Sequence, residues 1–338
     1  MMLSPGRSVT VEVPATSANL GPGFDCFGLA LDWRERVNLA VIENGYQVEV
    51  SGEGATELPR DESHLIIRSV LIGLADLGRQ APGLWLGCRN TIPHGRGLGS
   101  SSAAIVAGLF AAAGLADVAV ELNWLLAHAT AIEGHPDNIA AAICGGFVLA
   151  YEGRNGVTVA QGRVAASIGA ILFIPETSLG TEAARGLLPN TVPHADAAAN
   201  SARAALLVHA MAAEPELLYD ATYDWLHQGY REAAMPGSYE LMKSLRGQGF
   251  AAMISGAGPS VLVLGRQSDL AVLQDQHVPG FSVRISGIGT GASIIEPSFA
   301  EGAANVNEAN LAGGVSSRME SSDAGANLRG PTWSGQLR

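Results

Sequence analysis

The chain contains 338 residues, 47% of them hydrophobic, and carries a formal net charge of -12 at pH 7. A chain of this length and apolar content can bury a sizeable core and is expected to form two domains. The acidic balance argues against nucleic acid as a partner, because binding to a phosphate backbone requires a basic surface. Neither the first ten residues nor the Ala-rich segment 103–120, which contains Asp117, fits a signal peptide or a membrane span.

The three cysteines, Cys26, Cys88 and Cys144, stand far apart in the sequence. Their odd number and isolation argue against a disulfide framework and against a zinc site. They indicate reduced thiols, so we expect a cytoplasmic protein.

The first part of the chain is predicted to form strands around a loop. Alternating apolar residues predict a strand over 8–14, and the small, Gly-rich segment 15–25 is predicted to be a loop outside the core. Asn44-Gly45, flanked by further apolar alternation, predicts a hairpin over 38–50.

A predicted helix over 61–77, with His64 on its surface, and a predicted strand over 84–89 lead to a glycine-rich segment. This segment reads Pro93-His94-Gly95-Arg96-Gly97-Leu98-Gly99-Ser100-Ser101-Ser102-Ala103. Apolar residues at steps of four then predict a helix that begins at the serines. Glycines allow close approach of a ligand and a helix start attracts anions, so the segment indicates a phosphate site. A tight turn before a helix is the alternative, which the serines disfavour because their hydroxyls can ligate Mg²⁺.

The segment has neither the lysine of a Walker loop nor the third glycine of a dinucleotide-binding fingerprint. Lys243 is the only lysine in the chain and lies in a predicted solvated helix over 240–246. Any phosphate must therefore be held by backbone N–H groups, arginine and metal.

The later elements suggest a second domain that begins near residues 155–167. The predicted elements are, in chain order, a helix over 120–132, a strand over 147–151, a turn at 153–156 before a strand pair, a buried strand over 168–174, a helical start at 181–189, helices over 196–213 and 219–230, strands over 249–254 and 261–264, a helix over 270–276, and strands over 281–285 and 292–295 that close one sheet. From Pro297 onward few large apolar residues occur, which predicts a disordered tail.

Three segments resemble motifs of the GHMP kinases in order and spacing: 15–25, 93–101 and Ser255-Gly256-Ala257-Gly258-Pro259-Ser260. The resemblance covers residues 10 to 295 and implies an α+β, two-domain fold. It implies a ribosomal S5-like domain with a left-handed βαβ crossover over 1–160 and a ferredoxin-like domain over 161–297, followed by the tail at 298–338. It also implies ATP binding by residues 93–103 together with Gly256 and Gly258.

Within this family the chain is most similar to the homoserine kinases. Asn138, in His135-Pro136-Asp137-Asn138, stands where mevalonate kinases and galactokinases have a catalytic aspartate. Since an asparagine cannot take a proton at neutral pH, the acceptor hydroxyl would lose its proton to the phosphate or through water. Asp137 is a rival base, although adjacent side chains are expected to diverge.

The resemblance implies ATP-dependent phosphorylation of L-homoserine to O-phospho-L-homoserine, with ATP and L-homoserine as small-molecule partners and a homodimer as one option for assembly. Mg²⁺ would be held by Ser101 and Glu133, unless Glu133 is a plain surface acid. Arginine forks suit carboxylates, and Arg185 and Arg231 match the arginines of homoserine kinases unless they are surface charges. The implied catalytic residues are Asn138, Arg185 and Arg231, and the implied substrate-binding residues are Asn19, Asp25, His135, Asn138, Thr181, Arg185 and Arg231.

Two other functions stay open on the sequence alone. One is a GHMP kinase for another small alcohol, and the other is a non-catalytic ligand sensor with the same fold. Homoserine kinases usually have an asparagine that contacts the purine in place of His64, so the adenine contacts are open as well.

Overall fold

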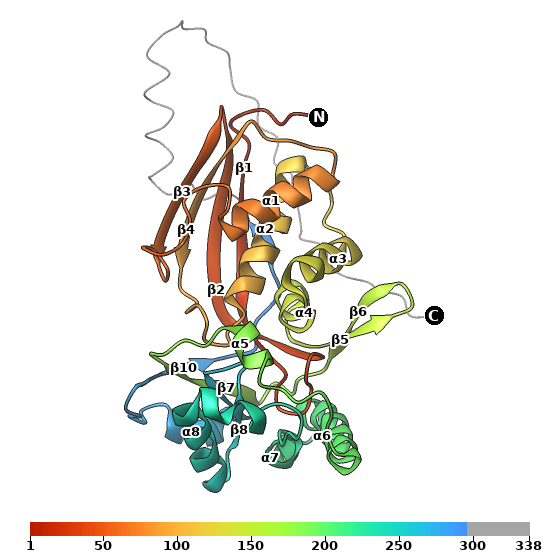
Figure 1. Cartoon of the computed structure of the whole chain (residues 1–338), viewed down its shortest axis with the longest axis vertical. Coiled ribbons are helices and arrows are strands. Elements are labelled where there is room, and N and C mark those ends of the chain that lie inside the picture. The colour runs from red at the N-terminus through yellow and green to blue at the C-terminus, as the bar shows by residue number, and fades with distance from the viewer. Residues whose placement is uncertain (296–338) are drawn as a thin grey trace, which may run out of the picture. The chain divides into compact units, whose positions relative to one another are not determined.

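Residues 1–295 are described by a computed structural model, in which two β-sheets carry helices (Figure 1). The first sheet has the strand order β11-β1-β2-β4-β3, and β5 pairs with both β2 and β6. Its strands are β1 (Ser8–Ala18), β2 (Phe27–Ile42), β3 (Gly45–Gly52), β4 (Gly83–Asn90), β5 (Phe147–Gly153), β6 (Gly156–Gly162) and β11 (Ser293–Ile295). The expected α+β class is thereby confirmed.

The second sheet has the order β10-β7-β9-β8, and its neighbouring strands are antiparallel. Its strands are β7 (Ile168–Pro175), β8 (Ala251–Ile254), β9 (Val261–Arg266) and β10 (Phe281–Ser286). With helices between β7 and β8 and between β9 and β10, the chain follows the β-α-β-β-α-β series of ferredoxin-like domains.

Four helices lie together on one side of the first sheet (Figure 1): α1 (Leu65–Asp76), α2 (Ser100–Ala116), α3 (Leu122–Glu133) and α4 (Asp137–Cys144). The central helix α2 is buried over almost its whole length because its residues are mostly alanine, glycine and aliphatic. Close packing on α1 depends on small residues: a Cβ added at Gly108 would lie 2.5 Å from the Ser69 Cβ. This packing fixes the position of the N-terminus of α2, which follows the glycine-rich loop.

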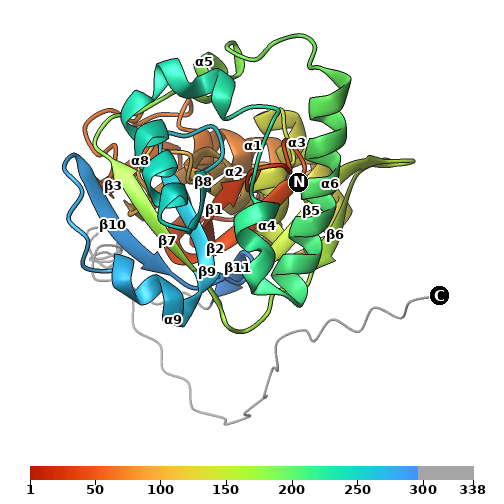
Figure 2. The same cartoon turned by 90° about the horizontal axis from the view of Figure 1, so that it is seen from below.

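The second sheet is buried on both faces, which explains why all eight residues of β7 are apolar or small. On one face α8 (Pro236–Gly247) packs against it (Figure 2), with Met242 and Leu245 against Ile171 and Phe173. Side chains on its other face belong to the same hydrophobic core as those of the first sheet, and α6 (His194–Ala212) contributes to this core. The short helices α5 (Thr181–Arg185), α7 (Leu218–Ala221) and α9 (Gln267–Leu270) complete this part.

The predicted hairpin at Asn44-Gly45 is wrong in its pairing. The chain does turn there, but β4 lies between the two arms, antiparallel to β2 and parallel to β3. Gly83 of β4 lies so close to the turn that a Cβ would be 2.5 Å from the Asn44 carbonyl carbon. A turn signal is local, whereas the insertion of a third strand is a long-range event that the turn cannot reveal. The connection from β3 through α1 to β4 is the parallel crossover that was expected, and its left-handedness stays a prediction.

The segment 15–25 is not a loop outside the core. Residues 15–18 continue β1, and residues 15–20 are all buried. Small side chains are needed there because the second glycine loop packs against them: Gly256 N–H donates to Ala18 O at 3.0 Å.

Two further element predictions are corrected. Residues 219–230 do not form one helix: α7 ends at Ala221, and the Asp224 carboxylate accepts the N–H groups of residues 226–228, which favours a turn over a helix. Residues 281–285 and 292–295 do not close one sheet, because β10 pairs with β7 whereas β11 pairs with β1. The proposed boundaries at 160 and 297 stay predictions, and the predicted tail lies outside the described residues.

Candidate active site

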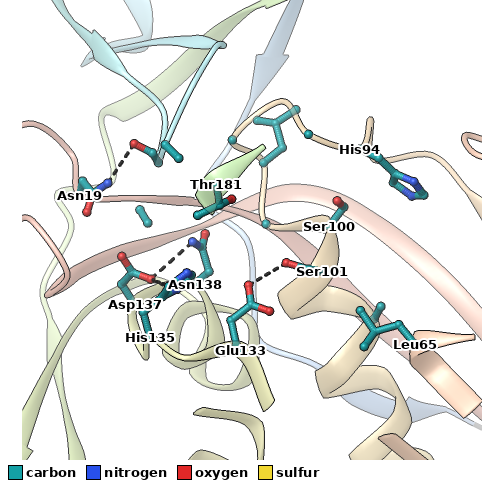
Figure 3. Close-up of a pocket in the computed structure, with 18 of the residues that line it drawn as sticks. Asn19, Leu65, His94, Ser100, Ser101, Glu133, His135, Asp137, Asn138 and Thr181 are labelled. Atoms are coloured by element: carbon teal, nitrogen blue, oxygen red, sulfur yellow. Dashed lines mark hydrogen bonds and ion pairs between the residues drawn. The ribbon is translucent and has the colours of Figure 1, made fainter. Parts of the chain in front are cut away.

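A cavity of about 360 Å³ opens where the loops of the two sheets meet. Figure 3 shows Asn19 at one end and His94 and Leu65 at the other, with Ser101 and Glu133 facing each other between them. The start of α2, the start of α4 and the loop at 255–260 all contribute to its wall.

The glycine-rich loop leaves the N-terminus of α2 open. Gly95, Gly97 and Gly99 all have φ between 65° and 68°, a conformation that L side chains rarely adopt. Gly99 is the N-cap residue, and within residues 1–295 no side chain caps the first turn of α2 by accepting a hydrogen bond. The N–H groups that begin α2 are therefore free to bind an anion, with the helix dipole in support.

The second glycine loop, residues 255–260, packs directly on the first. Ser255 Oγ donates to Gly97 O at 2.6 Å, and a Cβ at Gly97 would lie 2.1 Å from Ser255 O. Asn19 Nδ2 donates to Gly256 O at 2.9 Å. The two glycine loops and the end of β1 thus form one interlocked unit, which the separate motifs could not reveal.

Oxygen ligands suited to a hard cation stand at the start of α2. Ser101 Oγ and Ser102 Oγ lie 2.7 and 2.9 Å from Glu133 Oε1, at the end of α3. Hydroxyl and carboxylate oxygens beside a phosphate site fit Mg²⁺, which binds few protein ligands and takes the rest from phosphate and water. The residues present therefore fit the metal that the sequence implies.

The start of α4 presents Asp137 and Asn138 to the same cavity. Asn138 Oδ1 accepts from Thr16 Oγ1 at 2.7 Å, which leaves its Nδ2 as donor, at 3.4 Å from Asp137 Oδ1. The expectation that these adjacent side chains diverge is wrong, because both lie at the first turn of a helix and line one wall. His135 Nδ1 lies 3.4 Å from Asp137 Oδ1, and this contact raises the pKa of His135.

The acceptor end holds two guanidinium groups. Arg185 lies 2.7 and 2.8 Å from the two oxygens of Asp25, and its pKa is raised by that hydrogen-bonded pair. Arg231 is only 1% exposed, and its Nε donates to Ala184 O at 3.2 Å. The centroid of the Phe24 ring lies 5.5 Å from the Arg185 guanidinium and 5.6 Å from the Arg231 guanidinium. Both arginines line the cavity, so neither is a remote surface charge.

The other end of the cavity contains His64, which was predicted to lie on the surface, and Glu35, which was not predicted for the site. His64 is not a surface residue: it is 3% exposed, lines the cavity and caps α1 through its Nδ1, which accepts from Ile66 N–H. Burial, with the nearby Arg60 charge, lowers its pKa to about 4. Glu35 also lines this end; it accepts the N–H groups of Thr91 and Ile92, and burial raises its pKa.

The sequence does contain a signal for the burial of Glu35 and for the capping position of His64. Glu35 occupies an inward position in the alternation of β2, where its neighbours on that face are Trp33 and Val37. A carboxylate among apolar positions of one face indicates a buried acid with dedicated partners. His64 stands directly before an apolar helix start, where a cap residue is expected. The remaining lining residues outside the predicted set are Ala18, Leu58, Leu65, Ile66, Asn90, Ala104 and Ala257.

Most residues predicted for the site meet in this cavity, and five do not line it. The lining set is Asn19, Asp25, His94, Gly95, Gly97, Leu98, Gly99, Ser100, Ser101, Glu133, His135, Asn138, Thr181, Arg185, Arg231 and Gly256. Those outside it are Pro93, Arg96, Ser102, Ala103 and Gly258. The Arg96 guanidinium donates to the backbone carbonyls of His94, Pro175 and Glu176, so it ties the loop to β7. Lys243 is exposed on α8 and pairs with Glu240 at 3.0 Å.

Comparison with known proteins gives matches over most of the chain. The models described as the N-terminal and C-terminal domains of GHMP kinases match residues 64–146 and 202–279. The homoserine kinase of Streptomyces avermitilis is 48% identical over 292 residues, which cover 85% of this chain and 96% of that protein. The homoserine kinase of Streptomyces coelicolor is 51% identical over 260 residues, or 76% of this chain and 84% of that one.

Solved structures agree in fold. The crystal structure of homoserine kinase from Cytophaga hutchinsonii has a TM-score of 0.77 and 28% identity, and the match covers 86% of this chain and 98% of that one. A mevalonate diphosphate decarboxylase from Enterococcus faecalis, at 13% identity and a TM-score of 0.61, shares the fold alone. No helix within residues 1–295 has the length and apolar character needed to cross a membrane.

Proposed function

The chain belongs to the GHMP kinase family, and we propose that it transfers the γ-phosphoryl group of ATP to the side-chain hydroxyl of L-homoserine. The product is O-phospho-L-homoserine, and the reaction is a step of threonine biosynthesis. One observation carries this proposal: the open N-terminus of α2 and the side chains of Asp25, Arg185 and Arg231 line one cavity. Because the reaction would draw on ATP and a free amino acid, we propose that it takes place in the cytoplasm.

Phosphoryl transfer needs positioning and charge stabilisation more than covalent help. Backbone N–H groups of residues 99–101 and the positive end of α2 would hold the phosphates of ATP. Ser101 and Glu133 would hold Mg²⁺, which neutralises charge on the phosphate oxygens when bound. The nucleotide base would then extend toward Leu65 and His94 (Figure 3).

The opposite end suits an amino acid. Arg231 is a buried cation whose nearest oxygen partners are the carbonyls of Ala184 and Gly256. A buried charge without a counter-charge is costly, so an anionic ligand group is favoured there. Asp25 would accept the ammonium group, and Asn138 would orient the hydroxyl toward the phosphate. The hydroxyl proton would pass to the transferred phosphate or through water, so Asn138 does not need to take it up.

The two alternative functions fit less well. A kinase for an uncharged alcohol would bring no anionic group to Arg231, a buried cation that makes no ion pair within residues 1–295. A non-catalytic sensor would not need the Ser101 and Glu133 oxygens placed 2.7 Å apart beside an open helix start.

The test is ADP release measured with and without L-homoserine. Arg231→Ala is expected to lower kcat/KM for homoserine by roughly 100-fold or more, the scale for loss of one partner of a buried charge pair. Arg266→Ala is the matched control, since Arg266 makes an exposed ion pair with Glu216, and it should stay within about twofold of the wild type. Turnover that does not depend on homoserine, or that survives Arg231→Ala, would refute the proposal.

A further inference from the structure

His227 is a fully buried histidine that contacts two parts of the acceptor end at once. Its Nε2 lies 2.8 Å from Gly21 O, and its Nδ1 lies 3.1 Å from Nη1 of Arg231. A carbonyl oxygen only accepts and a guanidinium only donates. The ring must therefore carry its hydrogen on Nε2 and use Nδ1 as an acceptor, which is the neutral form.

The surroundings of the ring maintain that form. Burial and the Arg231 charge lower the pKa of His227, while the carboxylates of Asp224 and Asp25 oppose this shift. Asp224 Oδ1 lies 3.6 Å from Nε2, but both Asp224 oxygens also accept backbone N–H groups of residues 226–228. The Phe24 ring stacks on the imidazole at 5.3 Å between centroids.

Arg231 itself has few other restraints. Besides the Phe24 ring, whose centroid lies 5.6 Å from the guanidinium carbon, its remaining partners are the carbonyl oxygens of Ala184 at 3.2 Å and Gly256 at 3.5 Å. Among residues 1–295, no carboxylate lies within 4.0 Å of its nitrogens. The orientation of this guanidinium therefore depends strongly on the imidazole.

Gly21 belongs to the same short segment as Asn19 and Asp25. The segment is held closely: a Cβ at Gly21 would lie 2.4 Å from Thr222 O. His227 thus joins the segment that carries Asp25 to the side chain of Arg231.

We propose that His227 is a positioning residue: it orients Arg231 relative to segment 19–25 and so sets the spacing between the groups that bind the acceptor's carboxylate and its ammonium. The inference deepens the proposed function and rests on it. It makes His227 a determinant of selectivity for an α-amino acid, without contact between His227 and the substrate.

Two amide variants, His227→Asn and His227→Gln, each keep one of the two hydrogen bonds and remove the other. Asparagine places an oxygen near the Nδ1 position, so His227→Asn keeps an acceptor for Arg231 and loses the bond to Gly21. Glutamine places an amide nitrogen near the Nε2 position, so His227→Gln keeps the donor to Gly21 and loses the acceptor for Arg231. We expect His227→Gln to raise KM for L-homoserine at least about tenfold and His227→Asn only about threefold, with KM for ATP within about twofold for both.

A double variant shows whether the effect passes through Arg231. If it does, adding His227→Gln to Arg231→Ala should cause little further loss in kcat/KM, because the group being positioned is already gone. Asn200→Ala provides a matched control. Asn200 is also buried and also joins these segments, through Pro22 O at 2.8 Å and Trp225 N–H at 3.2 Å, but these hydrogen bonds do not involve Arg231. It should lower the melting temperature while KM for homoserine stays within about twofold.

Any one of three outcomes would overturn the inference. The first is a parallel rise of KM for homoserine and KM for ATP in His227→Gln, and the second is a rise of KM for homoserine in Asn200→Ala as large as in His227→Gln. The third is fully additive losses of kcat/KM in the double variant. A wild-type enzyme whose ADP release ignores homoserine would overturn the proposed function and this inference together. A wild-type enzyme that responds to homoserine, with variants that do not discriminate, would overturn this inference alone.

Discussion

The Arg185 guanidinium holds the Asp25 carboxylate in a two-point ion pair inside the cavity, with nitrogen–oxygen distances of 2.7 and 2.8 Å. The side chains are 40% and 35% exposed, so solvent screens the pair and opening it costs little, of order 1 kcal/mol or less. An amino acid in this cavity can therefore replace one internal ion pair by two pairs of its own. Its carboxylate would take the place of Asp25 at Arg185, and its ammonium would take the place of Arg185 at Asp25.

Asp25→Asn tests this exchange. The variant removes the negative charge that would meet the ammonium group and keeps the size of the side chain. We expect KM for L-homoserine to rise about 10- to 100-fold, the scale for one charged hydrogen-bond partner, and KM for ATP to change less than about twofold. Initial-rate kinetics with each substrate varied in turn would measure both values.

Glu12→Gln is the control for the ion pair. Glu12 pairs with Arg36 at 2.7 Å, on the first sheet and outside the cavity. Its loss should leave both KM values unchanged. An Asp25→Asn enzyme that behaves like Glu12→Gln would show that Asp25 does not face the substrate.

We expect Glu133→Gln to lower activity strongly and to change the stability of the fold little. The Glu133 carboxylate lies at the C-terminus of α3, where the dipole of α3 disfavours a negative charge. It also faces the N-terminus of α2, where the dipole of α2 favours a negative charge. These effects oppose each other, so the melting temperature should change little. Loss of the Mg²⁺ ligand should lower kcat about 100-fold or more and raise the Mg²⁺ concentration needed for half-maximal activity.

Glu240→Gln, which removes the exposed partner of Lys243 on α8, is the control for Glu133→Gln and should not alter the Mg²⁺ dependence. An unchanged Mg²⁺ titration in Glu133→Gln would exclude Glu133 as a ligand. Thermal melts of both variants, followed by circular dichroism, complete the comparison.

Gly99→Ala tests the loop itself. Gly99 has φ of +67°, and a Cβ there would lie 1.9 Å from Thr16 Oγ1, the group that donates to Asn138. Gly78 has a similar φ of +65°, and apart from its chain neighbours no atom of the described residues 1–295 lies within 4 Å of an added Cβ. Gly78→Ala should cost about 1 kcal/mol in the free energy of unfolding from backbone strain alone.

Gly99→Ala should cost at least about 2 kcal/mol more than Gly78→Ala, because the close contact adds to the same strain. Nucleotide binding should weaken in Gly99→Ala only. Urea unfolding and titration with a fluorescent ATP analogue would measure the two effects. Equal losses in both variants would mean that Thr16 moves aside and that the contact is not a constraint.

Several of these features could be predicted from the sequence, and the reason differs from one to the next. The loop at 93–103 was predictable because glycine spacing and a helix start are local properties of the chain. Arg185 and Arg231 were proposed from family motifs, and no periodicity in the sequence would have brought them together. The insertion of β4 beside β3 and the return of β11 to β1 depend on contacts between distant segments, and no local signal encodes those contacts. His64 stands directly before an apolar helix start, a local signal that predicts a cap but not the burial of the side chain.

His64 makes the stability of the fold depend on pH. Burial lowers its folded-state pKa to about 4, whereas an unfolded-state histidine titrates near 6.5. Between these values the unfolded chain binds a proton that the folded chain does not, so stability falls as the pH falls from about 6.5 toward about 4. With allowance for solvent screening, the loss should reach about 2 kcal/mol.

His64→Ser isolates this contribution. Serine can still cap α1 by accepting the N–H group that His64 Nδ1 now accepts, and it does not titrate. The two proteins differ only at this position, so the difference between their unfolding curves reports the effect of removing the His64 imidazole. We expect the wild type to lose stability relative to His64→Ser as the pH is lowered from about 7 to about 4.5. Parallel curves over that range would mean that His64 is protonated in the folded protein and that its imidazole reaches solvent.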